Sequence, residues 1–352
     1  MSEFAFPGIS GTYPVWVRNN TVAEVVNGLL EHGYEGAFVV TDSNVQSSVL
    51  DDGVTCPVFV CEPGESSKSH ERLFELERWL AQQRANRQSV VVAIGGGVVG
   101  DLAGFAAAVY MRGVAWVNCA TSLIAMVDSS LGGKTGIDLP EGKNLVGSFH
   151  DPASVVINPR WLSTLSDRDL KSGLAEVIKY TVLLDAKRFE GLESWISGAM
   201  SRDEDTLEEI IAFSIKSKAS IVGGDPLDRR GQRAMLNLGH TVGHAIEAAL
   251  GYQGMLHGEA VAVGMVLEAQ IGEAIGFTQP GTSDRIREAV RAAGLPAELP
   301  REIQIADLER AMEADKKNVV GGVSLALVPS IGEFGVVQNV PADILHKVVT
   351  EQ

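Results

Sequence analysis

Three of the seven histidines of this chain, His240, His244 and His257, lie in one stretch of small and apolar residues. His240 and His244 are four residues apart in a helical pattern, so they share one helix face. His257 opens a second small-residue helix, next to Glu259. Catalytic zinc typically has three protein ligands, often two histidines and a carboxylate. Histidines hydrogen-bonded within their helices are the alternative, but two clusters flanked by glycines favour a metal site.

A carboxylate that could complete this site lies earlier in the chain, in the segment LAEVIKY. Glu176 and Lys179 are one helical turn apart there, among apolar residues. A charge in such surroundings needs a partner. A buried salt bridge between the two is one interpretation. The other is function, with Glu176 as the missing metal ligand.

A glycine-rich loop, GGGVVGD at residues 95–101, is the second chemical signal. It follows an apolar strand-like run and precedes a small-residue helix, where backbone N–H groups can bind a phosphate. The spacing Gly95, Gly97, Gly100 matches the dinucleotide fingerprint, but the acidic residue expected about twenty positions later is missing. Tight helix–sheet packing therefore remains an alternative. Asp42, at the end of an earlier strand, is a separate candidate for binding ribose hydroxyls.

The third signal is the segment from Thr121 to Asn144. Its Gly-Lys-Thr at 133–135 resembles the end of a Walker A loop, but Asp128 stands where the first glycine of that loop belongs, which argues against an ATPase. Lysines on glycine turns are often only solvated. Together with Arg112, they would form the positive cluster that an anionic substrate requires. The polar residues in these turns are Lys134, Lys143 and Asn144, and an earlier turn carries Glu65 and Lys68.

The spacing of apolar residues predicts the elements that carry these groups. Strands are expected at 36–42, 89–94, 115–119 and 154–158, and helices at 71–85 and after the glycine loop. This alternation predicts a mostly parallel sheet covered by helices. Beyond Leu165 the strand signal nearly vanishes and helical patterns follow one another. We therefore expect an α/β, Rossmann-like domain at 1–165 and an all-α domain at 166–352.

Composition excludes several classes of function. The 352 residues carry a net charge of -16, with 45% hydrophobic and 21% charged residues, as in an ordinary globular protein. Binding to nucleic acid or to an anionic membrane is not expected, because both need a basic surface. Three cysteines without metal-like spacing, and a start that does not resemble a signal peptide, predict a cytoplasmic protein with reduced thiols.

The motifs, taken in order, resemble 3-dehydroquinate synthases. They are GGGVVGDLAGFAAAVYMRG, VDSSLGGKTGI, GKNLVGSF, GLAEVIKY, LNLGHTVGHAIE and HGEAVAVGM, and the likeness runs from about Asp42 to Lys317. It implies a homodimer with an NAD-binding domain, a helical domain, and zinc or cobalt in the cleft between them. The implied reaction converts 3-deoxy-D-arabino-heptulosonate 7-phosphate to 3-dehydroquinate and phosphate, in the shikimate pathway that leads to aromatic amino acids. NAD would remove a hydride and later return it, so no net oxidation results.

The resemblance also implies roles for individual residues. The metal ligands would be Glu176, His240 and His257. His244 would then contact the substrate, although the helical spacing alone pairs it with His240 as a metal ligand. The implied NAD contacts are Asp42, Glu65, Lys68, Gly96, Gly97, Val98, Val99, Gly100, Asp101, Thr121, Ser122, Lys134, Lys143 and Thr164. The implied substrate contacts are Arg112 from the neighbouring subunit, Asp128, Lys134, Lys143, Asn144, Lys179, Lys218, Arg233, Asn237, His244 and Lys316.

The chain departs from the family's usual pattern at three places. Asp138 stands where an asparagine is common, Ala120-Thr121-Ser122 replaces Pro-Thr-Thr, and the loop 224–233 is one residue longer. The charge of Asp138 could change how Lys134 or the substrate is held, and the loop could shift Arg233. These changes bear on the identity of the substrate more than on the class of reaction.

Three alternatives stay open. The first is a related cyclase that acts on sedoheptulose 7-phosphate, or that makes 2-deoxy-scyllo-inosose from glucose 6-phosphate. The retained GGKTG, Lys218 and Arg233 favour a substrate with a carboxylate. The second is a metal-dependent alcohol or glycerol-phosphate dehydrogenase, which would consume NAD stoichiometrically. The third is a non-catalytic NAD-binding protein, which the intact set of ligands and cations argues against.

Overall fold

The computed structural model describes residues 2–50, 53–229, 232–316 and 324–350. The chain divides into two units, which are described separately below. The first unit comprises Met1–Ser166 and Leu207–Leu227, and the second comprises Asp167–Thr206 and Asp228–Gln352. The division of functions between domains, and the cleft expected between them, stay predictions.

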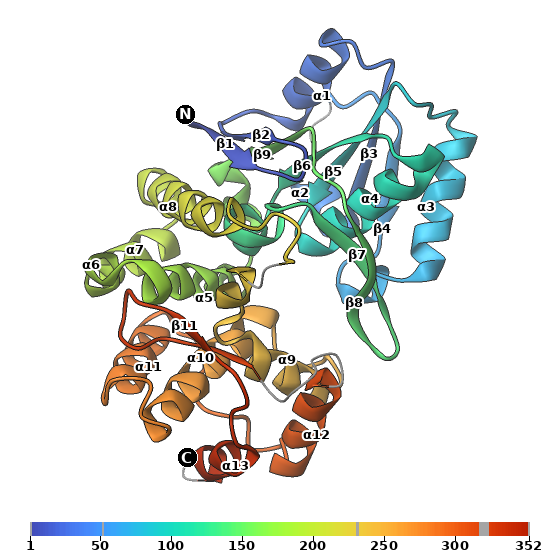
Figure 1. Cartoon of the computed structure of the whole chain (residues 1–352). Coiled ribbons are helices and arrows are strands. Elements are labelled where there is room, and N and C mark those ends of the chain that lie inside the picture. Colours follow the sequence, from blue (N-terminus) through green and yellow to red (C-terminus); the bar gives the residue numbers. More distant parts are fainter. Residues whose placement is uncertain (1, 51–52, 230–231, 317–323, 351–352) are drawn as a thin grey trace. The chain divides into compact units, whose positions relative to one another are not determined.

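A seven-stranded sheet forms the centre of the first unit (Figure 1). Its strand order is β1-β2-β9-β6-β5-β3-β4. Strand β1 pairs antiparallel with β2, and the remaining neighbours pair in parallel. Strand β5, SVVVAIG, is buried along its whole length, as a central parallel strand covered on both faces should be. The strands are β1 Ser2–Pro7, β2 Thr12–Val17, β3 Gly36–Asp42, β4 Val58–Cys61, β5 Ser89–Gly95, β6 Ala115–Ala120 and β9 Ser154–Ile157. The predicted α/β class is confirmed.

The carboxyl ends of β3 and β5 form a topological switch point in this sheet. Strands β3 and β5 are neighbours, but the chain continues from β3 to β4 on one side of this pair and from β5 to β6 on the other. The register pairs Thr41 with Ile94, and Gly95 with Ala120. Asp42, the glycine turn and Thr121 therefore leave the sheet at the same edge. Ligands of open α/β sheets bind at such a point.

Helices and a hairpin complete the first unit. Helix α4 packs on β5, β6 and the β7–β8 hairpin, and its Gly104 allows the close approach, since a Cβ there would lie 2.5 Å from the Thr135 side chain. The hairpin corrects the sequence prediction, which placed Lys134 and Lys143 on two separate turns. Helix α8 begins in the second unit and enters the first at Leu207. The elements are α1 Val22–Glu31, α2 Ser43–Ser48, α3 His70–Gln82, α4 Gly97–Val109, β7 Lys134–Leu139, β8 Gly142–Phe149 and α8 Glu204–Val222.

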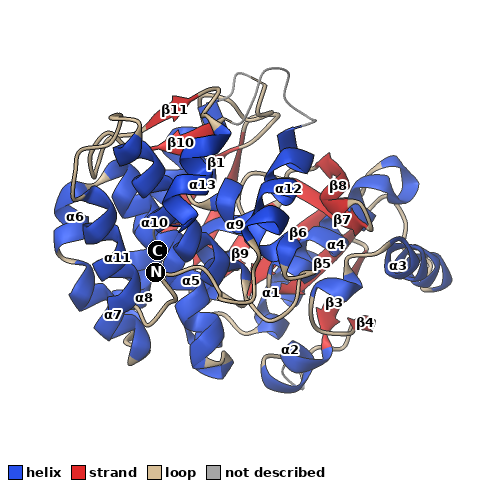
Figure 2. Cartoon of the chain, turned by 90° about the horizontal axis from the view of Figure 1, so that it is seen from below, coloured by secondary structure: helices blue, strands red, loops and turns tan. Residues whose placement is uncertain are grey.

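The second unit is built mainly from helices (Figure 2). The predicted helical character is confirmed, but the antiparallel pair of β10 and β11 was not predicted, because strands of three residues are too short to show an alternating pattern. Helices α9 and α10 pack together around Val242, Ile246, Val263 and Leu267. In the described part of the chain, no helix has both the length and the hydrophobicity to cross a membrane. The elements are α5 Asp167–Leu184, α6 Ala186–Glu190, α7 Leu192–Met200, α9 His240–Ala249, α10 His257–Ala274, α11 Thr282–Ala292, α12 Ile305–Lys316, β10 Leu325–Leu327, β11 Gly335–Val337 and α13 Ala342–Thr350.

Candidate functional site

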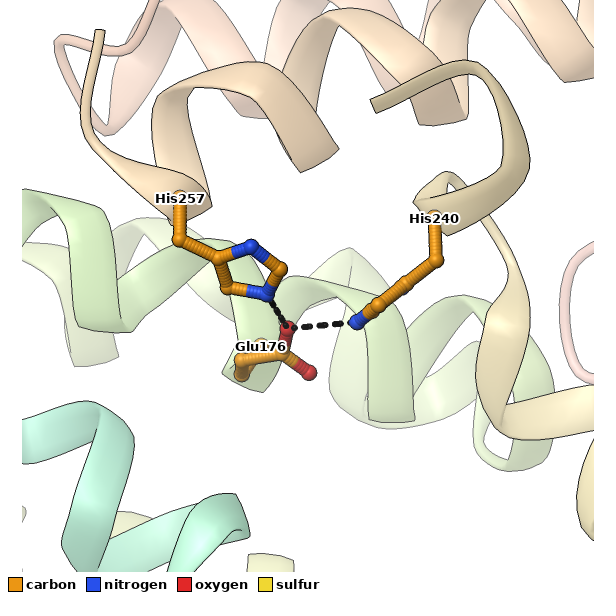
Figure 3. Close-up of side chains that lie close together, drawn as sticks. All are labelled: Glu176, His240 and His257. Atoms are coloured by element: carbon orange, nitrogen blue, oxygen red, sulfur yellow. Dashed lines mark ion pairs between the residues drawn. The ribbon is translucent and has the colours of Figure 1, made fainter. Parts of the chain in front are cut away.

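Helices α5, α9 and α10 bring Glu176, His240 and His257 together in the second unit (Figure 3). One ligand atom from each residue lies within 4.8 Å of the others. Glu176 Oε1 is 3.4 Å from His240 Nε2 and 3.9 Å from His257 Nε2. Two imidazoles and a carboxylate are a common set of protein ligands for zinc. The three predicted ligands, which are far apart in the sequence, therefore form one cluster.

The charges around Glu176 keep His240 in its neutral form. Its side chain is 1% exposed and forms an ion pair with the equally buried Lys179. Burial, followed by the Lys179 ammonium, lowers the pKa of His240. A lowered pKa keeps this imidazole neutral, which is the form that binds a metal. The salt bridge between Glu176 and Lys179 is therefore present, as one interpretation of the sequence predicted. Glu176 also faces the two histidines.

Two glycines determine how closely the three helices approach. Gly258, next to His257, packs on α5 so tightly that a Cβ there would lie 1.9 Å from the Ser172 carbonyl oxygen. Its N–H donates to Ser172 Oγ at 3.1 Å. Gly264 of α10 meets the chain just before α9, where a Cβ would lie 2.0 Å from the Gly239 oxygen. These contacts hold the start of α10 against α5, and α9 against α10.

His244 lies beside the cluster on the exposed side of α9. The ring centroid of His244 is 5.5 Å from that of His240 and 5.7 Å from that of His257. His244, Glu247 and His257 form a second group whose ligand atoms lie within 4.8 Å of one another. Glu247 was not predicted from the sequence, although its position seven residues after His240 puts it on the same helix face. A proton-relay role for His244 stays a hypothesis.

The glycine turn of the first unit lies between β5 and α4, at the switch point. Gly96 is the N-cap of α4, and Thr121 N donates to the Gly95 carbonyl at 2.9 Å. Cβ atoms on Gly96 and Gly97 would lie 3.2 Å and 3.0 Å from the hydroxyls of Ser122 and Ser129. The glycines therefore bring hydroxyl-bearing side chains close to the backbone N–H groups at the helix start, which is a suitable place for a phosphate. Val98, Val99, Gly100 and Asp101 form the first turn of α4 behind them.

Asp42 lies beside this turn and caps α2. Its Oδ1 accepts from the N–H groups of Asn44 and Val45 at 2.9 Å and 3.0 Å. It lies at the end of β3, as predicted. Its ribose-binding role stays a prediction.

A charged cluster around Lys68 links three predicted NAD contacts. The Lys68 side chain is 4% exposed, and its Nζ lies 2.9 Å from Asp101 Oδ2, 3.4 Å from Glu65 Oε1 and 3.8 Å from Asp138 Oδ1. Burial raises the pKa of Asp101 to about 6, although Lys68 opposes this rise. Glu65 Oε1 also lies 3.7 Å from Lys143 Nζ. We call Lys68, Glu65, Asp101 and Asp138 the Lys68 cluster.

Asp138, one of the departures from the family pattern, belongs to this cluster. Its Oδ1 accepts from the Asn144 N–H at 2.7 Å, and Asn144 Oδ1 accepts from Lys68 Nζ at 2.5 Å. Asn144 has a left-handed backbone, with φ of 55°. Asp138 therefore holds the β7–β8 hairpin to Lys68. Its expected effect on Lys134 or the substrate stays a prediction.

Lys218 and Asp128, two predicted substrate contacts, meet in the first unit. Lys218 Nζ is buried and lies 2.8 Å from Asp128 Oδ1, and it donates to the Asp128 carbonyl at 2.7 Å. Asp128 belongs to a π-helix, Ala125–Ser129. Such helices are rare and occur frequently at functional sites. No pattern in the sequence predicted this π-helix.

The remaining predicted residues are more scattered. Arg112 is exposed, with a left-handed backbone (φ 67°), at the end of the 3-10 helix Tyr110–Arg112. Lys134 begins β7, and Thr164 is exposed at the end of a 3-10 helix after β9. Arg233 is buried and Asn237 exposed in the 3-10 helix Gln232–Asn237. Lys316 ends α12, and its side chain lies outside the described residues.

The matching family models and a relative of known name belong to the same family. The family model described as 3-dehydroquinate synthase N-terminal matches residues 58–172, and the one described as 3-dehydroquinate synthase C-terminal matches 173–318. The chain is 40% identical over 345 residues to a 3-dehydroquinate synthase of Symbiobacterium thermophilum, covering 95% of this chain and 96% of the relative.

Two solved structures of cyclases are also similar. A 2-deoxy-scyllo-inosose synthase, complexed with carbaglucose-6-phosphate, NAD+ and Co2+, has a TM-score of 0.88 at 25% identity and covers 99% of each chain. A 2-epi-5-epi-valiolone synthase from Streptomyces hygroscopicus, with NAD+ and Zn2+ bound, has a TM-score of 0.85 at 25% identity and covers 96% of each chain.

Proposed function

Because the chain belongs to the 3-dehydroquinate synthase family, we propose that it converts 3-deoxy-D-arabino-heptulosonate 7-phosphate to 3-dehydroquinate and phosphate. This is a lyase reaction, in which phosphate is eliminated and a carbocycle closes. The observation that carries the proposal is the convergence of Glu176, His240 and His257 from three helices. A metal at this cluster and a nucleotide at the glycine turn are the two cofactors that such a reaction needs.

The described residues fit both cofactors. The donor set of two imidazoles and one carboxylate suits Zn2+ or Co2+. The glycines at the start of α4 leave room that a Cβ would fill, and they expose N–H groups to a pyrophosphate. When bound, NAD would supply a hydride acceptor and the metal would supply a Lewis acid at the reacting hydroxyl.

The remaining residues would bind and orient the substrate. Lysine and arginine side chains at the predicted substrate positions would balance the charges of a phosphate and a carboxylate. Lys179 already places an ammonium beside Glu176, and Lys218 places one beside Asp128. For the aldol closure the protein needs mainly to hold a reactive conformer. His244 would relay protons at the substrate hydroxyls, and an unchanged turnover in His244→Ala would remove that role.

The assembly belongs to the same proposal. We infer a homodimer in which Arg112 reaches the substrate of the neighbouring subunit, as the family resemblance implies. Its exposed position is compatible with such a contact. Sedimentation of the purified chain tests the dimer. An Arg112→Ala variant that keeps the dimer but raises the KM for the substrate would support the contact.

The deciding experiment measures phosphate release from 3-deoxy-D-arabino-heptulosonate 7-phosphate, with NAD and with Zn2+ or Co2+. We expect release that needs both cofactors, forms dehydroquinate and is lost in a folded Glu176→Ala variant. Absorbance at 340 nm should not accumulate, because the hydride returns to the product. No release from a protein that binds metal and NAD would contradict the proposal.

A related cyclase activity is the second candidate. The structural likeness to 2-deoxy-scyllo-inosose and 2-epi-5-epi-valiolone synthases favours it, because a shared fold can serve several sugar phosphates. The same assay with sedoheptulose 7-phosphate and glucose 6-phosphate separates the candidates. Turnover of either one, without turnover of the heptulosonate, would replace the primary assignment.

A further inference from the structure

Two buried carboxylates that are not among the proposed metal ligands lie behind the histidine cluster. Glu247 of α9 is 4% exposed, and Glu268 of α10 is 0% exposed. A buried carboxylate is costly unless it is hydrogen-bonded, so each should have a structural or functional partner. In both cases, the partner belongs to the other helix.

Glu247 contacts the ring of His257. Its Oε2 lies 3.3 Å from His257 Nδ1. A carboxylate can only accept here, so Nδ1 carries the proton and the lone pair is at Nε2. Nε2 is the nitrogen that faces Glu176, at 3.9 Å from Oε1. Glu247 thus selects the tautomer and the ring orientation that a metal ligand requires.

Glu268 contacts the backbone at the start of α9. Its Oε2 accepts from Gly239 N at 2.6 Å, and its Oε1 accepts from Val242 N at 3.1 Å. The N-cap residue of α9 is Gly239, which has no side chain to accept from these N–H groups, so a carboxylate from α10 takes over that task. His240 is the first residue of α9. Glu268 therefore fixes the backbone from which this ligand projects.

We propose that Glu247 and Glu268 form a reciprocal brace between α9 and α10 that positions His257 and His240 for the metal. Each helix carries one proposed ligand and the carboxylate that positions the ligand of the other helix. The proposal rests on the metal centre of the proposed function. Both are positioning residues, because they act on the metal through the histidines.

A competing role for Glu247 must be separated from this one. His244, Glu247 and His257 also have ligand atoms within 4.8 Å of one another, which would allow a second metal ion. An ion held between Glu247 Oε2 and His257 Nδ1 would replace the hydrogen bond on which the brace depends. The brace therefore requires one metal ion per chain, and a second site would give two.

The test measures the affinity and stoichiometry of Zn2+ by chelator competition, together with the Tm of the metal-free protein. The variants are Glu247→Ala, Glu247→Gln and Glu268→Gln. The matched control is Glu273→Gln, since Glu273 of α10 caps α11 in the same way, accepting from Ser283 N at 2.8 Å and from its hydroxyl at 3.0 Å. Helix α11 carries none of the proposed ligands.

We expect one Zn2+ per wild-type chain, and a loss of affinity of about 10- to 100-fold in Glu247→Ala and about 10-fold in Glu268→Gln. Glu247→Gln should regain part of the affinity, because its amide oxygen can still accept from Nδ1. Glu273→Gln should lower the Tm but leave the affinity unchanged.

Three results would overturn the proposal. Unchanged Zn2+ affinity in both Glu247→Ala and Glu268→Gln would reduce the two residues to structural roles. Two ions in the wild type and one in Glu247→Ala would make Glu247 a ligand. A wild-type chain that binds no metal would overturn the proposed metal centre together with the brace.

Discussion

The contact between Gly258 and α5 allows a sharp test of how the candidate metal centre is assembled. A Cβ at residue 258 would lie 1.9 Å from the Ser172 carbonyl oxygen, whereas an ordinary contact is longer than 3.4 Å. A backbone oxygen cannot rotate away, so in Gly258→Ala the start of α10 has to move by roughly 1 Å or more. Overpacking of this kind costs about 1–3 kcal/mol. We expect the upper end, since the hydrogen bond from Gly258 N to Ser172 Oγ is strained as well.

The same movement displaces His257, which is adjacent to Gly258. We therefore expect Gly258→Ala to weaken Zn2+ binding as well as stability. Urea unfolding measures the loss of stability at equilibrium, and chelator competition measures the loss of Zn2+ affinity. The control is Gly28→Ala in α1, where a Cβ would meet nothing within 4 Å, so alanine should stabilise by up to about 1 kcal/mol. Wild-type stability and Zn2+ affinity in Gly258→Ala would refute the reasoning.

Four further predictions concern the charged groups and the metal. In the wild type, the contribution of Asp101 to stability should be lost as the pH rises from about 4 to about 6, because its folded pKa lies above the unfolded one. Lys68→Met should destabilise by about 3–5 kcal/mol at pH 8, where three carboxylates remain ionised without the ammonium, and less at pH 5; urea unfolding with equal loss at both pH values would contradict this. Asp138→Asn keeps an acceptor for the Asn144 N–H but removes a charge from the Lys68 cluster. In steady-state kinetics, Asp138→Asn should change the KM for NAD by up to about fivefold and leave the KM for the sugar phosphate unchanged. A changed KM for the sugar phosphate with an unchanged KM for NAD would indicate that Asp138 acts on the substrate. Removing the metal with a chelator should lower the Tm of the wild type. At a metal concentration 100 times Kd, the loss corresponds to about 2.7 kcal/mol of stability. The Tm of Glu176→Ala should not change on chelator treatment.

Local patterns in the sequence were enough to predict most of the elements and, together with the family resemblance, the three candidate metal ligands. The buried runs of β3 and β5 are continuous and apolar, and α9 and α10 are rich in small and helix-favouring residues, so their types could be predicted. Glu176, His240 and His257 were identified by residue type and by the family resemblance, and the structure brings them together. The short strands β10 and β11 and the β7–β8 hairpin were missed, because few residues and many glycines leave no clear period.

Only the tertiary structure decided which charged groups meet. Asp138 joins Lys68, 70 residues earlier in the chain, and Glu268 reaches the backbone ahead of His240. A carboxylate has no periodicity of its own, so its partner depends on how helices and strands pack, through contacts such as those of Gly258 and Gly264. The sequence by itself determined the chemical groups and the elements that carry them. Packing determined the distances between these groups and their burial, and these two quantities set the pKa shifts of the groups.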